Sequence, residues 1–245
     1  MEVNTVTLNR LFVVGQNIMQ LQSMYRLMPG EKITRLKIMR YVSFGALKRS
    51  FDFVMASTLL LGLSPMFLIV AMGIKLDSPG PVFFRQKRTG KGGKEFNMYK
   101  FRSMAADNDV RDVSCEDKYT KFGKVLRRTS IDELPQLINI VRGQMSFIGP
   151  RPWVTEYWSN MNDEERMRAM VRPGITGLVA AKGRNGLSVF EKIEYDLEYV
   201  RNYSLRQDIK IVFLTMKTVA KGDEVNAGKS GIHNDIKELK KRNRG

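Results

Sequence analysis

The sequence predicts an α+β fold that is mostly helical, with one kinked helix in a membrane and a short β-hairpin. The first observation is a long apolar run, residues 51–76, whose only charges lie near its ends. The second is a pair of strand-like segments, 82–88 and 95–104, around the Gly- and Lys-rich loop 89–94. Apolar residues at helical spacing then follow. These helical patterns cover residues 116–128, 131–142, 153–170, 188–204 and 208–219.

The composition indicates an ordinary folded chain with an anionic partner. At 245 residues, 43% of them hydrophobic, the chain has room for one domain with extensions. Its formal net charge is +16, which favours a nucleic acid, an anionic lipid surface or a phosphorylated substrate as partner. A single cysteine excludes an intrachain disulfide, and with only one histidine as well the chain has too few ligands for a zinc site.

The apolar run is expected to enter a membrane. A straight helix over residues 51–76 would reach roughly 39 Å, against a hydrocarbon core of about 30 Å. Ser64 and Pro65 lie near its middle, where proline removes a backbone hydrogen bond and kinks the helix. Lys and Arg flank both ends, so the positive-inside rule places both flanks on the cytoplasmic side. We therefore predict a re-entrant helix, broken at Ser64 and Pro65, in which the Ser64 hydroxyl caps a freed carbonyl. A simple single span is the alternative.

These features divide the chain into four segments. Residues 1–47 form an N-terminal extension of unassigned role, and 48–77 form the re-entrant membrane helix. Residues 78–220 form a small cytoplasmic domain, and 221–245 a basic C-terminal tail that we expect to be frayed or peripheral. The last helical pattern, 208–219, is compatible with a position against the membrane.

Two adjacent carboxylates, Asp132 and Glu133, lie where a helix is expected to begin. Proline is tolerated in the first turn of a helix, so Pro135 predicts a start near residues 130–132. Ser130 and Glu133 match a capping box, in which each side chain bonds the backbone N–H of the other residue. Capping alone would be a sufficient explanation for an arbitrary sequence of this type.

The position of Asp132 also suits phosphate chemistry. A helix N-terminus carries partial positive charge and free N–H groups. Arg127 and Arg128 directly precede the segment and add formal positive charge. We therefore expect Asp132 to stay ionised in a cationic environment.

Short motifs recur along the chain from about residue 48 to about residue 215. Taken singly, each is explained by a basic strand, a rigid turn or a hairpin tip. In this order they resemble the bacterial sugar transferases, the monotopic polyprenol-phosphate phosphoglycosyl transferases. The matching segments are Lys48-Arg-Ser-Phe-Asp-Phe, Ser64-Pro65, Pro81-Val-Phe-Phe-Arg-Gln-Lys-Arg-Thr-Gly90, Tyr99-Lys-Phe-Arg-Ser-Met104, Thr120 through Gln136, Met145-Ser-Phe-Ile-Gly-Pro-Arg-Pro152, Arg172-Pro-Gly-Ile-Thr-Gly177, Gly183-Arg-Asn185 and Glu194-Tyr-Asp196.

The resemblance implies a reaction at the cytoplasmic face of the bacterial inner membrane. Such enzymes move sugar-1-phosphate from a nucleoside-diphosphate sugar, usually a UDP-sugar, onto undecaprenyl phosphate and release UMP. It is the first membrane step in making a surface glycan. The implied partners are these two substrates and anionic membrane lipids, with no nucleic acid, while self-association is left open. The resemblance also implies a re-entrant helix and a small catalytic domain.

The resemblance assigns roles to residues in the matching motifs. Asp132 is the expected nucleophile, which forms a covalent phosphosugar intermediate. Glu133 is the second catalytic carboxylate, and the pair is the expected site for the cofactor Mg²⁺. Arginines bind phosphates bidentately, and basic side chains in these motifs are the expected substrate ligands. These are Arg127, Arg151, Arg184, Lys100 and Arg102.

One segment departs from the family pattern, and two other functions compete. Residues 178–182 read Leu-Val-Ala-Ala-Lys, where the family usually has Trp-Ala-Gln-Val-Asn, which puts sugar or uridine contacts from this segment in doubt. The apolar run 51–76 is not expected in a basic nucleic-acid-binding protein, and no groove-reading motif is apparent in the sequence. A non-catalytic, basic membrane-associated binding protein is the other alternative, and the intact Asp132–Glu133 pair disfavours it.

Overall fold

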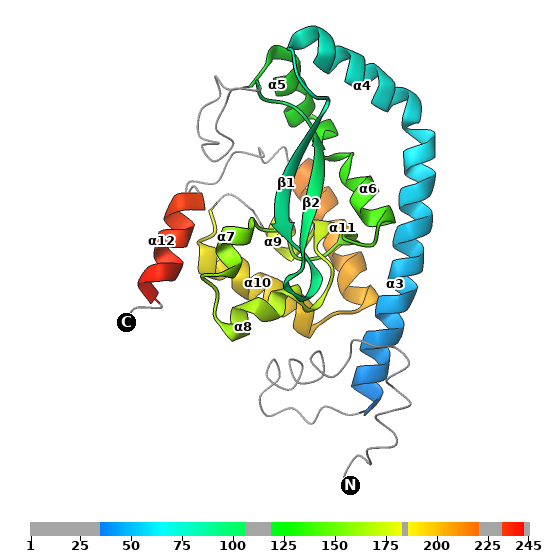
Figure 1. The fold of residues 1–245 in the computed structure, drawn as a ribbon. Coiled ribbons are helices and arrows are strands. Elements are labelled where there is room, and N and C mark those ends of the chain that lie inside the picture. The colour runs from blue at the N-terminus through cyan, green and yellow to red at the C-terminus, as the bar shows by residue number, and fades with distance from the viewer. Residues whose placement is uncertain (1–34, 106–118, 183–185, 221–231, 243–245) are drawn as a thin grey trace.

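The computed structural model describes residues 35–105, 119–182, 186–220 and 232–242 (Figure 1). A long helix, α3 (Arg35–Gly62), runs along one side, and α4 (Ser64–Asp77) turns away from its end over the top of the molecule. The described residues are mostly helical with small β-sheets, which confirms the predicted α+β class.

The break between α3 and α4 lies at Leu63, directly before Ser64 and Pro65. Pro65 has no N–H to donate to the Leu61 carbonyl four residues earlier, and the Ser64 hydroxyl donates to that carbonyl instead at 2.8 Å. The predicted cap is therefore confirmed. Within the described ranges no single helix is long and apolar enough to cross a bilayer. Judged by length and composition, the stretch from Tyr41 to Asp77 passes only as two helices bent by 61°.

The hairpin comes directly after α4. Strands β1 (Phe83–Thr89) and β2 (Glu95–Phe101) pair along their full length in antiparallel register. A short 3-10 turn, η2 (Lys91–Gly93), joins them, and Gly92 and Gly93 adopt φ values of 66° and 78° that favour glycine. The expected hairpin is confirmed.

Short elements pack behind the hairpin. A second sheet pairs β3 parallel to β4. The bounds are α5 (Lys121–Arg128), η4 (Ile131–Glu133), α6 (Gln136–Val141), β3 (Ser146–Ile148), α7 (Thr155–Trp158), α8 (Asp163–Arg166), η5 (Met167–Met170), β4 (Gly174–Thr176), α9 (Leu178–Ala181), α10 (Val189–Arg201), α11 (Leu205–Ala220) and α12 (Ile232–Arg242).

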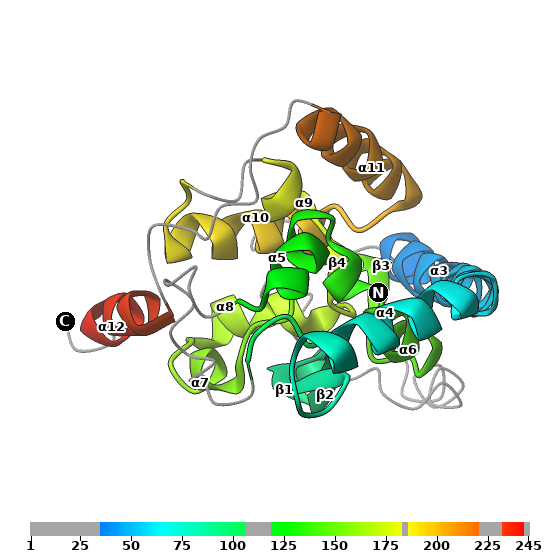
Figure 2. The ribbon, with the colours of Figure 1, turned by 90° about the horizontal axis from the view of Figure 1, so that it is seen from above.

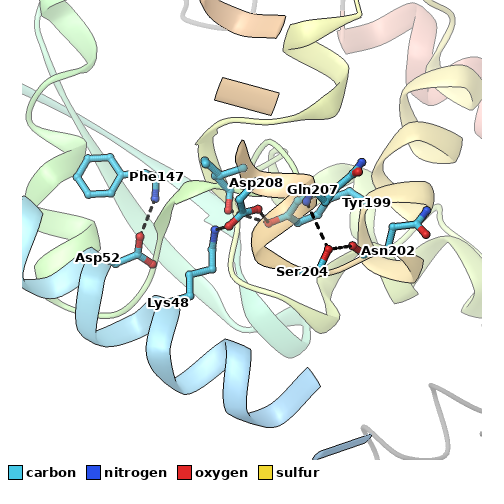
Figure 3. A network of polar contacts seen from close by, with 9 residues as sticks. Lys48, Asp52, Phe147, Tyr199, Asn202, Ser204, Gln207 and Asp208 are labelled. Carbon is cyan, nitrogen blue, oxygen red and sulfur yellow. Dashed lines mark hydrogen bonds and ion pairs between the residues drawn. The ribbon is translucent and has the colours of Figure 1, made fainter. Parts of the chain in front are cut away.

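Buried polar contacts attach α3 to the rest of the protein (Figure 3). The Lys48 ammonium pairs with the Asp208 carboxylate of α11, to which the Tyr199 hydroxyl also donates at 2.7 Å. One turn further along α3, the Asp52 carboxylate accepts from the Phe147 N–H of β3 at 3.3 Å. The matched motif that begins at Lys48 therefore fixes α3 to two other elements.

Helix α6 is held between α3 and strand β2. The Arg49 guanidinium donates to the last two carbonyls of α6, each at 2.7 Å. On the other side, the buried Asn139 amide accepts from the Tyr99 N–H at 3.0 Å and donates to the Asn97 carbonyl at 2.7 Å. The segment after the two carboxylates is therefore anchored to both neighbours.

Large apolar side chains are exposed on the bent pair and on α11. Leu61 is 77% exposed, Leu76 is 88% exposed and Phe213 is 68% exposed. Figure 2 shows α11 on the same side of the molecule as α3, and α12 on the opposite side. Apolar surface of this kind marks an interaction site. The α11 residues concerned are Leu205, Ile209, Val212, Phe213 and Met216.

Two expectations about helices are confirmed only in part. Residues 153–170 form three short helices, because Asn162 and Glu165 make a capping box that starts a new helix after α7. Residues 232–242 are not frayed, because they form α12, in which Leu239 is fully buried and Asp235 accepts from the Tyr157 hydroxyl at 2.9 Å.

Candidate active site

The two carboxylates lie on a 3-10 turn, η4, between α5 and α6. Ser130 precedes the turn with a left-handed φ of 57°, and its side chain makes no capping bond. The predicted capping box is therefore absent. A helical turn does begin at Ile131, near the predicted start, but it is the 3-10 turn η4. The α-helix itself begins only at Gln136, after Pro135 with φ −61°.

Glu133 turns toward two basic side chains and away from Ser130. Its Oε1 accepts from the Lys100 ammonium of β2 at 2.6 Å and from the Arg151 guanidinium at 3.1 Å. Burial would raise the pKa of the Glu133 carboxyl. The charges of Arg151 and Lys100 outweigh burial and hold that pKa at about 2, against a usual 4.5. Glu133 is therefore ionised throughout the neutral range.

Asp132 has a different environment, although it is the adjacent residue. Its side chain is buried, and no described residue donates a hydrogen bond to its carboxylate. Burial raises the pKa of the Asp132 carboxyl, and the Glu133 charge adds to this, whereas Lys100 and Arg127 act in the opposite direction. The expected stabilisation of ionised Asp132 is thus outweighed by desolvation. The Asp132 carboxylate is therefore poorly solvated, and its oxygens accept no hydrogen bond from the described residues.

The predicted phosphate-binding arginines differ in how the structure places them. Arg151 contacts Glu133, and its side chain is 38% exposed, so it has donors left for a ligand. Arg127 lies over the Tyr119 ring, 4.6 Å from the ring centroid, and is close enough for its charge to act on Asp132. Arg184 lies outside the described residues.

The structure does not support the prediction that Arg102 binds substrate. Its buried guanidinium donates to the Pro79 carbonyl at 2.5 Å and to the Ser78 carbonyl at 2.7 Å. A longer contact of 3.5 Å reaches the Ile74 carbonyl of α4. Arg102 therefore closes the C-terminal end of α4 and the turn after it, where carbonyl groups lack helical partners.

The expected metal site, the pair of Asp132 and Glu133, lies within the described residues. They hold no group of three or more His, Cys, Asp or Glu side chains suited to a metal. Mg²⁺ is usually bound by one or two carboxylates together with substrate phosphates and water. Asp132 fits this pattern, whereas Glu133 already uses one oxygen on two cations. The donor set fits a metal that arrives with the substrate.

Two side chains near the site had no role in the sequence-based prediction. Asn139 fixes α6 to β2, and a polar residue inside the apolar run 134–141 was the available signal. Arg88 of β1 is half-buried close to Arg151 and Glu133. It belongs to the matched basic segment, and the available signal was the alternation of side chains along a strand, which places Arg88 on the face opposite its exposed neighbours Arg85 and Lys87.

The structure combines a pair of acidic side chains among basic ones with two apolar helices joined at a bend of 61°. The chain belongs to the bacterial sugar transferase family, whose sequence model matches residues 43–222. The family predicted from the motifs is confirmed.

Three relatives of known name are similar in sequence to this chain. The chain is 42% identical over 188 residues to a UDP-glucose:undecaprenyl-phosphate glucose-1-phosphate transferase of Caulobacter vibrioides, covering 72% of this chain and 70% of that protein. It is 42% identical over 177 residues to a transferase of the same name from Xanthomonas campestris pv. campestris, covering 67% of this chain but only 37% of that protein. It is 37% identical over 194 residues to the exopolysaccharide production protein ExoY of Sinorhizobium fredii, covering 71% and 86%. The chain thus spans well under half of the Xanthomonas relative.

Proposed function

We propose that this protein transfers sugar-1-phosphate from a UDP-sugar to undecaprenyl phosphate, with release of UMP. The observation that carries the proposal is the Asp132 carboxylate, which is buried and accepts no hydrogen bond from the described residues. The adjacent Glu133 carboxylate is held in place by Lys100 and Arg151. UDP-glucose is the first sugar donor to test, because the Caulobacter and Xanthomonas relatives are named for it. A surface glycan such as an exopolysaccharide is the proposed destination, as the name of ExoY suggests.

The proposed reaction has two displacements at one phosphorus. First, a carboxylate oxygen of Asp132 attacks the β-phosphorus of the UDP-sugar, and the bond to the bridging oxygen breaks as UMP leaves. Next, a phosphate oxygen of undecaprenyl phosphate attacks the same phosphorus and frees the Asp132 carboxylate. The low solvation of Asp132 favours its attack, while Arg151 and Arg127 supply positive charge for the phosphoryl oxygens.

Mg²⁺ is part of the proposal. Asp132 would hold it together with the diphosphate, and the Glu133 oxygen that faces neither Lys100 nor Arg151 could add a second contact. When bound, the ion neutralises charge on the diphosphate. Lys100 and Arg151 set the orientation of Glu133 through their shared contact with Oε1.

We place the protein on the cytoplasmic face of the bacterial inner membrane. The exposed apolar residues of α3 and α4, and the bend of 61° between the two helices, support a re-entrant pair. In a Cys115→Ser background, Leu47→Cys and Lys87→Cys place single thiols on the two flanks. A re-entrant pair lets an impermeant thiol reagent label both from the cytoplasmic side alone. Labelling from opposite sides would establish a single span.

The test of the reaction is UMP release from UDP-sugars in the presence of undecaprenyl phosphate. The wild-type protein should release UMP, and Asp132→Asn should release none, because an amide oxygen cannot form the intermediate. Asp163→Asn makes the same chemical change at an exposed position of α8 and should leave the rate unchanged. Turnover near the wild-type rate in Asp132→Asn would exclude Asp132 as nucleophile. No UMP release by the wild type with any UDP-sugar would favour a non-catalytic membrane-bound binding protein.

A further inference from the structure

The loop that carries Arg151, residues 150–153, is held at every backbone carbonyl. The first carbonyl accepts from the Gly174 N–H at 2.9 Å and the last from the Thr89 N–H at 2.9 Å. Between them, the Arg151 carbonyl accepts from the Arg168 guanidinium at 2.7 Å. The Pro152 carbonyl accepts from the Arg88 guanidinium at 3.1 Å. Two of these four donors are therefore charged side chains from outside the loop.

The Arg168 guanidinium is held by contacts with a carboxylate, an aromatic ring and a backbone carbonyl. Its Nε and Nη2 donate to one oxygen of Asp196 at 2.9 and 2.5 Å, and both side chains are almost completely buried. Its guanidinium lies 4.2 Å from the centroid of the Trp153 ring. An arginine with a paired carboxylate, an aromatic neighbour and a carbonyl acceptor has one available position, so it defines where the Arg151 backbone lies.

Arg88 holds the next carbonyl from the opposite element, strand β1. Besides the Pro152 carbonyl, it donates to the Gln86 side chain. No described acidic residue forms an ion pair with it, and its Nε is buried without a partner. Arg88 is half-buried, and burying its Nε without a partner or a paired carboxylate costs stability, so a role other than stabilising the fold is expected at this position.

We propose that Arg168 and Arg88 are positioning residues that set the Arg151 guanidinium on Glu133 by fixing the two successive carbonyls at the base of its side chain. The proposal rests on the proposed function, in which Arg151 contacts the transferred phosphoryl group. Because the Arg151 and Pro152 carbonyls are both held, the backbone position from which the Arg151 side chain extends is fixed. It can then keep its 3.1 Å contact with Glu133 while it presents its remaining donors to substrate.

A double-mutant cycle tests whether Arg168 acts through Arg151. Arg168→Lys keeps a charge for Asp196 but cannot reach the Arg151 carbonyl as well. With Arg151 intact we expect it to lower kcat/KM for UMP release by roughly 10- to 100-fold, the range for small misplacements of a binding group. In an Arg151→Ala background the same change should lower kcat/KM by less than about 3-fold, because its target is gone.

A purely structural role predicts a different result, namely the same fold loss in both backgrounds, and this result would overturn the proposal. The matched control is Glu165→Gln, which breaks a buried acid–arginine pair with Arg242 away from the carboxylates. Its effect on kcat/KM should be equal in the two backgrounds.

Should Arg168→Lys fail to fold, Arg88→Lys enters the same cycle with the same expectation, and an equal loss in both backgrounds again overturns the proposal. A wild-type protein that releases no UMP would instead refute the proposed function, which separates the two failures.

Discussion

Replacing Glu133 by glutamine tests the electrostatics of the site directly. The pKa of the Glu133 carboxyl lies at about 2, against a usual 4.5, and its side chain is only 19% exposed. A difference of this size corresponds to about 3 kcal/mol of stability at pH 7, at 1.4 kcal/mol for each pKa unit. Glu133→Gln should lose most of this amount, because its amide does not carry the charge that binds Lys100 and Arg151.

The pH dependence follows from the direction of the shift. A carboxyl whose pKa is lowered by folding stabilises the protein fully above its unfolded pKa, and this stability is lost as the pH falls toward the folded pKa. Between pH 7 and pH 3 the wild type should therefore lose about 2 kcal/mol that Glu133→Gln does not lose. Asp132, whose pKa is raised, acts in the opposite direction in both proteins. Urea unfolding in detergent at several pH values measures the difference.

The control for this experiment is Glu164→Gln, because Glu164 is 66% exposed and pairs only loosely with Arg201 at 3.7 Å. Its stability should stay within about 1 kcal/mol of the wild type at every pH, as is usual for surface pairs. Parallel pH profiles for the wild type and Glu133→Gln would refute the assignment of Glu133 as a carboxylate held by two cations.

Two further predictions concern Arg102, whose guanidinium lies at the end of α4, and the C-terminal helix α12. Arg102→Met should lower the free energy of unfolding by about 2 kcal/mol or more, because it leaves buried carbonyls at the end of α4 without a donor. Lys100→Met, two residues earlier, should also lower stability, because it breaks the pair with Glu133, but it should in addition lower the rate of UMP release. Equal effects of the two changes on the rate would contradict this difference in role. Leu239→Ala should cost about 2–4 kcal/mol in thermal or urea unfolding, because Leu239 is fully buried, and a cost near zero would mean that α12 is detached in solution.

Features set by neighbouring residues could be predicted from the sequence. The break at Ser64 and Pro65 depends on one missing N–H and on a hydroxyl next to it, so its cap was predictable. The hairpin likewise follows from two strand patterns around a glycine-rich loop. The family was recognisable because many short motifs occur in one order.

Features set by distant residues could not be predicted. Ser130 and Glu133 match a capping box by spacing, but Lys100 and Arg151 bind the Glu133 carboxylate more strongly than a backbone N–H would. Arg102 lies in the same motif as Lys100, and only its burial against α4 shows that it serves a different purpose. The capping box at Asn162 and Glu165 was readable from spacing, and it forms although Arg242 also donates to the Glu165 carboxylate. The left-handed φ of 57° at Ser130 is a second difference between the two sites.

The strand that carries Lys100 also acts as a spacer. Lys100 reaches the carboxylate pair and Arg102 reaches the end of α4, and two residues of strand span only about 7 Å. If α4 returns to the membrane surface as proposed, this distance limits how far Glu133 can lie above the lipid head groups. The phosphate group of a long-chain lipid would then reach the carboxylate pair with little movement out of its leaflet. An insertion between residues 100 and 102 should therefore impair the lipid acceptor more than the soluble sugar donor.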